Sequence, residues 1–208
     1  MLAAENTLLS VAQIVPCTEA EGPGRRFALW FQGCPLRCPG CCNPEMLPFA
    51  GGNQRTLAEV VEQIVRAREE NAVEGVTLLG GEPLAHAEVA AILAKAARGL
   101  GLSVMVFTGY TLAEARALPD PAVADLLAHT DILVDGRYVR ELPEARRRWI
   151  GSGNQQIHFL TDRYRADDPC WEMPNTLEIR LVNGDVTVNG FPAEKATDIW
   201  RRVSTSAF

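Results

Sequence analysis

The sequence predicts an α/β protein: an open parallel sheet forming a partial β/α barrel, followed by a C-terminal β-hairpin and a short helix. Short apolar runs alternate with amphipathic segments of helical period, the pattern of parallel strands joined by crossover helices. About five or six such strands can be counted, too few for a closed eight-stranded barrel. A chain of 208 residues suits one main domain, which we assign to residues 1–160, with an extension over 161–208.

The first half of the chain alternates strands and helices. Residues 8–15 and 26–32 read as strands, and the second is almost continuously apolar, as expected for a strand covered on both faces. Thr56-Leu57-Ala58-Glu59 has the form of a capping box, which predicts the start of a helix. A buried strand over 75–79 and a helix over about 87–98 follow.

The alternation continues in the second half. Helix starts are predicted at a second capping box, Thr111-Leu112-Ala113-Glu114, and at Asp120-Pro121, where Asp is the N-cap and Pro the first helical residue. Asn183-Gly184 between two strand-like runs is a strong hairpin signal. The remaining predicted segments are strands over 102–107, 131–134 and 157–160, a polar linker over 163–174, hairpin strands over 176–182 and 185–189, and a helix near 193–203.

Four polar or glycine-containing motifs directly follow predicted strands. The carboxyl ends of parallel strands meet at one edge of the sheet, where α/β proteins bind their ligands. The sequence therefore predicts one site at that edge. The motifs are the cysteine loop at 32–43, Gly80-Gly81-Glu82-Pro83, Thr108-Gly109-Tyr110 and Asp135-Gly136-Arg137-Tyr138.

The cysteine loop places Cys34, Cys38 and Cys41 at C-x3-C-x2-C spacing, close enough for three thiolates to hold one metal centre. A structural zinc site would need a fourth ligand. The nearest histidine is His86, there is no second C-x-x-C pair, and Cys42 adjoins Cys41 and would strain to bind the same metal. An iron–sulfur cubane held by three cysteines instead leaves one iron with an open position.

Composition limits the classes of function. A net charge of −6 does not favour a nucleic-acid-binding surface, and no apolar run reaches membrane-spanning length. The N-terminus lacks the basic region and apolar core of a signal peptide, so we expect a cytoplasmic protein. In that compartment six cysteines indicate metal or redox chemistry rather than disulfides.

The cysteine spacing after a first barrel strand resembles that of the radical S-adenosylmethionine (SAM) superfamily. Within it, the chain resembles the activating component of anaerobic ribonucleotide reductase, a glycyl-radical-enzyme activase, from about residue 8 to 160. Two features depart from that family: Cys42 stands where an aromatic is usual, and the chain continues past residue 160. The shared motifs are 22–24, Cys38-Pro39-Gly40-Cys41 with Asn43, 80–84, 108–110, 133–136 and 149–155.

The resemblance implies a [4Fe–4S] cluster bound by Cys34, Cys38 and Cys41, with SAM chelating the fourth iron. It also implies that backbone carbonyls of the Gly80-Gly81-Glu82-Pro83 motif accept hydrogen bonds from the SAM ammonium, with Glu82 adding charge. Asp135 could accept the ribose hydroxyls, although a turn or helix-cap role is as probable. The remaining SAM contacts that we expect are Thr108, and Gly40 and Cys42 beside the adenine.

The implied function is reductive cleavage of SAM to a 5′-deoxyadenosyl radical that abstracts hydrogen from a glycine of a large partner glycyl radical enzyme. The expected electron donor is flavodoxin or ferredoxin, by analogy with the family. Two alternatives stay open. One is a radical SAM tailoring enzyme acting on a peptide or small metabolite, which the extra segment favours. The other is a non-catalytic iron–sulfur or zinc-binding interaction protein.

Overall fold

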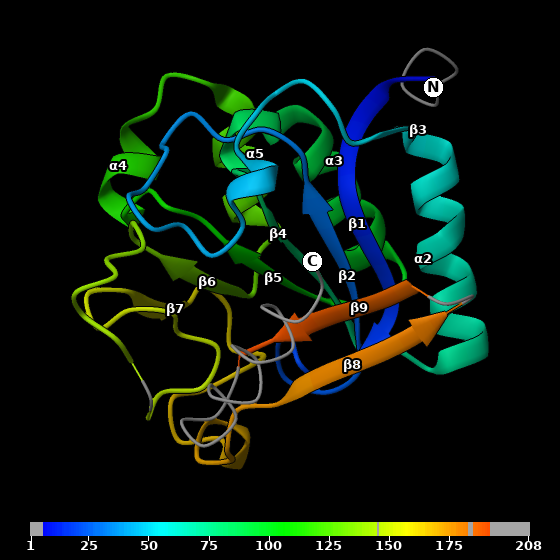
Figure 1. The fold of residues 1–208 in the computed structure, drawn as a ribbon. Helices are drawn as coiled ribbons and strands as arrows, with labels where there is room; N and C mark the ends of the chain where they lie inside the picture. Colours follow the sequence, from blue (N-terminus) through cyan, green and yellow to red (C-terminus); the bar gives the residue numbers. More distant parts are fainter. Residues whose placement is uncertain (1–5, 145, 183–184, 192–208) are drawn as a thin grey trace.

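A seven-stranded mixed sheet forms the body of the protein in the computed structural model, which describes residues 6–144, 146–182 and 185–191 (Figure 1). The strand order across the sheet is β3-β1-β2-β4-β5-β6-β7. The strands are β1 (Leu8–Thr18), β2 (Arg26–Phe31), β3 (Asn53–Thr56), β4 (Gly75–Gly80), β5 (Ser103–Phe107), β6 (Ile132–Asp135) and β7 (Gln156–Phe159).

The four central strands, β2, β4, β5 and β6, run parallel to one another, as predicted. Both edges differ from the all-parallel prediction. Strand β1 is antiparallel to β2 and β3, and β7 is antiparallel to β6. The reason lies in the connections: among the residues that the structure describes there, no helix separates β1 from β2 or β6 from β7, so the chain returns without a crossover.

The helices begin where the sequence predicts. The side chains of Thr56 and Thr111 each accept a hydrogen bond from the backbone N–H of the glutamate three residues later. The side chain of that glutamate in turn accepts from the backbone N–H of the threonine, so both capping boxes are confirmed. Asp120 caps its helix through Ala122 N at 2.9 Å. The α-helices are α2 (Leu57–Asn71), α3 (Ala87–Gly99), α4 (Leu112–Ala117) and α5 (Pro121–Ala128), and the 3₁₀ helices are η1 (Pro44–Met46), η2 (Pro83–His86) and η3 (Pro169–Trp171). Among the described residues, no helix combines the length and hydropathy needed to cross a membrane.

The sheet has a different cover on each face. Helices α2, α3 and α5 pack against one face, where Phe27, Leu29 and Leu78 belong to the largest buried apolar cluster (Figure 1). On the opposite face, Met105 and Ile132 pack with Trp149 in a second cluster. This second face is the one that the C-terminal part of the chain covers.

The hairpin strands β8 (Leu177–Val182) and β9 (Asp185–Gly190) pair antiparallel and lie across the sheet on the face opposite α3 and α5 (Figure 1). The predicted hairpin strands are thus confirmed, while the Asn183-Gly184 turn and the 193–203 helix fall outside the described residues. Residues 163–174, read as a polar linker, form an irregular segment with η3 that packs against the body of the protein. Tyr164 and Trp171 pack against the Met105–Trp149 cluster, a long-range contact that polar composition does not reveal.

A buried carboxyl group joins the start of the chain to the hairpin. Glu21 is 2% exposed, and its Oε1 accepts a hydrogen bond from Asn189 Nδ2 at 3.2 Å. Burial is the largest cause that raises the pKa of Glu21 from 4.5 to about 8, against the lowering effect of the Asn189 hydrogen bond. The folded protein therefore holds this proton at neutral pH.

We expect Glu21→Gln to flatten the pH dependence of stability. Because the folded-state pKa lies above the unfolded one, the contribution of Glu21 is full below pH 4.5, declines as pH rises towards 8, and is lowest above 8. The amide of Gln mimics the protonated acid and does not titrate. As pH rises from 5 to 8.5, the free energy of unfolding of the variant should therefore increase relative to that of wild type by roughly 3–5 kcal/mol. Urea unfolding across this range measures the effect, and parallel curves for the two proteins would contradict it.

Candidate functional site

A partly open cavity of about 170 Å³ lies at the carboxyl edge of the parallel strands. Loops that follow β2, β4, β5 and β6 all contribute to its lining, which confirms that the four motifs share one edge of the sheet. The predicted site residues that line the cavity are Cys34, Cys38, Cys41, Cys42, Gly80, Gly81, Glu82 and Thr108. Gly40, Pro83 and Asp135 lie nearby but are not part of the lining.

The cysteine loop leaves β2 and is closed at its base by backbone hydrogen bonds. Gly33 N donates to Met46 O at 2.9 Å, and Cys34 N donates to Leu47 O at 3.0 Å. Glycine is required at position 33, where φ is +104° and an added Cβ would lie 2.4 Å from the Phe49 ring. The loop therefore holds its cysteines at a fixed place at the end of the strand.

Backbone amides face two of the loop thiols. Asn43 N donates to Cys41 Sγ at 3.4 Å, and the amides of Leu36 and Arg37 face the Cys34 thiol. Burial is the largest cause and raises the pKa of Cys34 and of Cys41 overall, and these amides oppose it by lowering the pKa. Amide donors favour the thiolate form, which is the form that binds iron.

The donor set suits an iron–sulfur cubane, because three soft thiolates and amide donors share one cavity wall. In the described part of the chain, no three His, Cys, Asp or Glu side chains converge on a position for a single ion. In a cubane each thiolate binds a different iron atom, so such convergence is not what this group requires.

The carboxyl group of Glu82 links the loop that follows β4 to the loop that follows β5 through hydrogen bonds. Its Oε1 accepts from Thr108 Oγ1 at 2.8 Å and Leu84 N at 2.9 Å, and its Oε2 accepts from Gly109 N at 2.9 Å. The residue is 1% exposed, and burial is the main cause that raises its pKa from 4.5 to about 7. The carboxyl group thus organises two loops of the cavity.

The exit of β4 also touches the cysteine loop. Gly81 has no room for a side chain, since an added Cβ would lie 2.2 Å from Gly33 O, and Glu82 N donates to the same carbonyl at 3.0 Å. The loop that carries the cysteines and the glycine motif are therefore positioned by direct backbone contact.

Asp135 supports the loops from outside the cavity lining. Its Oδ2 accepts from Leu112 N, at the start of α4, and interacts with His158 Nε2 on β7, both at 2.7 Å. Gln155, which does line the cavity, joins two of its loops. Its Oε1 accepts from Gly151 N and Ser152 N, and its Nε2 donates to Gly136 O at 2.9 Å.

Several lining residues were not predicted from the sequence. Trp149 is fully buried at a φ of +59°, and its Nε1 has no hydrogen-bond partner among the described residues. The hydroxyl of Tyr138 lies beside the Cys42 thiol. Phe107 and Phe191 complete the apolar part of the lining. The motif at 149–155 pointed to Trp149, whereas no local pattern indicates that Phe191 returns to the site.

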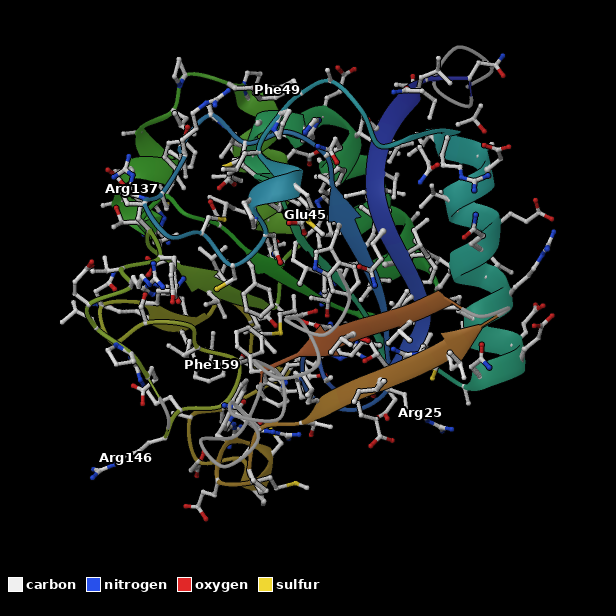
Figure 2. The ribbon with its side chains drawn as sticks, viewed as in Figure 1. Arg25, Glu45, Phe49, Arg137, Arg146 and Phe159 are labelled. Carbon is white, nitrogen blue, oxygen red and sulfur yellow. The ribbon has the colours of Figure 1, made fainter. Side chains whose placement is uncertain are left out.

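Two other sequence features lie apart from the cavity lining. The His86 ring stacks on Phe31 at a centroid distance of 5.1 Å, so its place is in the packing beneath the cysteine loop. In the basic run, Arg146 projects away from the body of the protein (Figure 2). Arg147 instead binds Glu144 and the carbonyls of Gln155 and Gly153, and Arg148 packs over Trp149, so the run forms no continuous basic patch.

Comparison with known proteins identifies the family. The model of the 4Fe-4S single cluster domain matches residues 20–158. The anaerobic ribonucleoside-triphosphate reductase-activating protein of Vibrio cholerae is 32% identical over 155 residues, covering 72% of this chain and 97% of that protein. Its counterpart in Escherichia coli K12 is 34% identical over 154 residues, covering 71% of this chain and 97% of that protein. The chain belongs to the family of anaerobic ribonucleoside-triphosphate reductase-activating proteins.

Members of this family are radical SAM enzymes, so this protein is one as well, with a [4Fe–4S] cluster and SAM as its cofactors. The homologue of enterobacteria phage T4 is 29% identical and covers 72% of the chain and 94% of its own length. Among solved structures, QueE of Escherichia coli gives a TM-score of 0.41 at 18% identity over 53% of this chain and 57% of its own. The matched domain model ends at residue 158, before the segment that forms η3, β8 and β9.

Proposed function

We propose that this protein activates a glycyl radical enzyme, such as an anaerobic ribonucleotide reductase, by generating a radical on a glycine of that partner. The observation that carries the proposal is that three thiols of one loop share a cavity with the exits of β4, β5 and β6, in a chain of the activating-protein family. When bound, the cluster supplies one electron to SAM, whose cleavage gives methionine and a 5′-deoxyadenosyl radical that abstracts hydrogen. An open barrel, with residues 1–160 as its core, would suit a protein substrate.

The residues of the chain hold and orient the two cofactors in this proposal. Cys34, Cys38 and Cys41 would hold the [4Fe–4S] cluster through their thiolates, which leaves one iron open for SAM. Carbonyls of Gly80 and Gly81 would accept hydrogen bonds from the SAM ammonium, and the close approach of Gly81 to Gly33 would keep this glycine motif next to the cysteine loop.

The nucleoside end of SAM would lie across the exits of the remaining strands. Asp135 would accept the ribose hydroxyls through Oδ1, since its two known contacts share Oδ2. Thr108, Gly40 and Cys42 would lie along the nucleoside, with Tyr138 beside Cys42. A low-potential flavodoxin or ferredoxin would supply the electron.

Anaerobic reconstitution tests the function. Protein loaded with iron and sulfide, reduced with dithionite and mixed with SAM should form 5′-deoxyadenosine, and adding the partner reductase should produce a doublet glycyl radical signal by electron paramagnetic resonance. A reduced, cluster-loaded protein that forms no 5′-deoxyadenosine would contradict the proposal. Tightly bound zinc with one iron atom or less per chain would instead favour a structural metal protein.

A tailoring enzyme is the second candidate, and one observation favours it. Tyr164, Trp171 and Phe191 pack on the sheet face that carries Met105 and Ile132, and Phe191 also lines the cavity, which narrows the space for a large partner. Formation of 5′-deoxyadenosine without a radical on any glycyl radical enzyme, but with a modified peptide or metabolite, would support this candidate.

A further inference from the structure

The extension contributes one residue to the cavity lining. Phe191 follows β9 directly and lines the cavity together with Phe107 and Trp149. Its ring stacks on Phe107, the last residue of β5, with centroids 6.2 Å apart and planes at 21°. Among the described residues, Phe191 is the only lining residue from beyond residue 155. Phe107 ends β5 just before the cavity loop at 108–109, so Phe191 lines the cavity at the exit of β5, and we call this stacked pair the apolar floor of the cavity.

The backbone that delivers Phe191 is fixed on both sides. Asn189 Nδ2 donates to Thr18 Oγ1 at 3.0 Å and to Glu21 Oε1 at 3.2 Å, and Phe191 N donates to Thr176 O at 3.1 Å. Between them, Gly190 has a φ of +103°, and an added Cβ would lie 2.2 Å from Thr176 O. A backbone held this closely places the next side chain at a defined position.

The same segment holds the neighbouring wall. Trp171 meets Trp149 edge-on at a centroid distance of 5.2 Å, and Asn175 Oδ1 accepts from Trp149 N at 3.0 Å. Arg148 lies 4.2 Å from the Trp149 ring centroid and donates to Cys170 O. These contacts hold Trp149 in the left-handed backbone region, a strained conformation that persists only when its surroundings enforce it.

We propose that Phe191 is a specificity-determining residue, which sets the depth of the cavity and thereby the fit of SAM and of the substrate segment that enters beside it. This inference rests on the proposed function. The segment beyond residue 158 lies outside the matched domain model, so the floor is an addition to what the family shares. An apolar floor of fixed shape favours one seating of the ligand, and displacement of reacting atoms by about 1 Å can slow a reaction about 100-fold.

The test uses the full chain, reconstituted with its cluster, and compares wild type with Phe191→Leu and Phe191→Ala. Leu181→Ala is the matched control, because Leu181 is on the same hairpin but 72% exposed and is not part of the cavity lining. Three quantities are measured: the affinity for S-adenosylhomocysteine by calorimetry, the melting temperature, and the number of partner radicals formed per 5′-deoxyadenosine.

We expect the affinity for S-adenosylhomocysteine to fall about tenfold in Phe191→Ala and less in Phe191→Leu, with fewer partner radicals per 5′-deoxyadenosine in both. The control should match wild type. Phe191→Leu keeps an apolar side chain in the floor, so it remains informative if the alanine variant melts early. Affinity and radical yield both unchanged in a folded Phe191 variant would overturn the inference. Wild type that binds S-adenosylhomocysteine but cleaves no SAM would overturn the proposed function instead.

Discussion

Replacement of Cys34 by alanine should abolish both the iron–sulfur absorbance and the cleavage of SAM. Cys34 is 6% exposed, lies at the base of the cysteine loop and faces the amides of Leu36 and Arg37. A cubane with two protein thiolates loses its third anchor, and no cysteine outside the loop lines the cavity. We expect SAM cleavage to fall by roughly 10³-fold or more, equivalent to about 4 kcal/mol of barrier. Iron content, visible absorbance and 5′-deoxyadenosine formation measure the loss.

Two cysteine variants serve as controls for this experiment. Cys170 packs beside the Trp149 cluster and does not line the cavity, so Cys170→Ala should keep cluster and activity. Cys42→Ala should keep the cluster as well, because Cys42 is assigned next to the adenine and not to iron. A Cys34→Ala protein that retains a full cluster would show the ligand assignment to be wrong, and loss of the cluster in Cys42→Ala would place Cys42 among the ligands.

Local signals predicted the elements that hold the site. Capping boxes at Thr56 and Thr111 involve residues three apart, so each is readable from a short window and each is confirmed. The apolar run that forms β2 and the cysteines that follow it are likewise adjacent in sequence. Since parallel strands end at a common edge, these local predictions were sufficient to bring four separate motifs to one cavity.

Features that depend on distant contacts were not predicted. Strand β3, with the polar sequence Asn53–Thr56, exists because it pairs with β1, and nothing in its composition favours a strand. Trp171 packs on the Met105–Trp149 cluster from a polar segment that resembles a linker, and Phe191 reaches the same cluster from the end of β9. Asp135 was predicted to accept the ribose hydroxyls or to serve as a helix cap or turn residue, and its hydrogen bonds to Leu112 N and His158 require the folded sheet.

Replacement of Glu82 by alanine should damage both stability and activity. The change leaves the amides of Leu84 and Gly109 without their acceptor in a buried site, which costs roughly 2–5 kcal/mol. It also frees the β5 loop from the β4 loop, and we expect SAM cleavage to fall about 100-fold. Urea unfolding and 5′-deoxyadenosine formation measure the two effects. Glu88→Ala, an exposed glutamate on α3, is the control and should change neither.

Glu82→Gln separates the charge of this residue from its role in joining the loops. With a pKa raised to about 7 by burial, the Glu82 side chain is neutral below that pH and carries a charge above it. If the charge helps to bind the SAM ammonium, the ratio of the wild-type affinity for S-adenosylhomocysteine to that of the variant should rise about tenfold between pH 6 and pH 8. The ligand amine titrates alike in both measurements, so the difference reports Glu82. A constant ratio of affinities would assign Glu82 to loop organisation alone, through Leu84, Thr108 and Gly109.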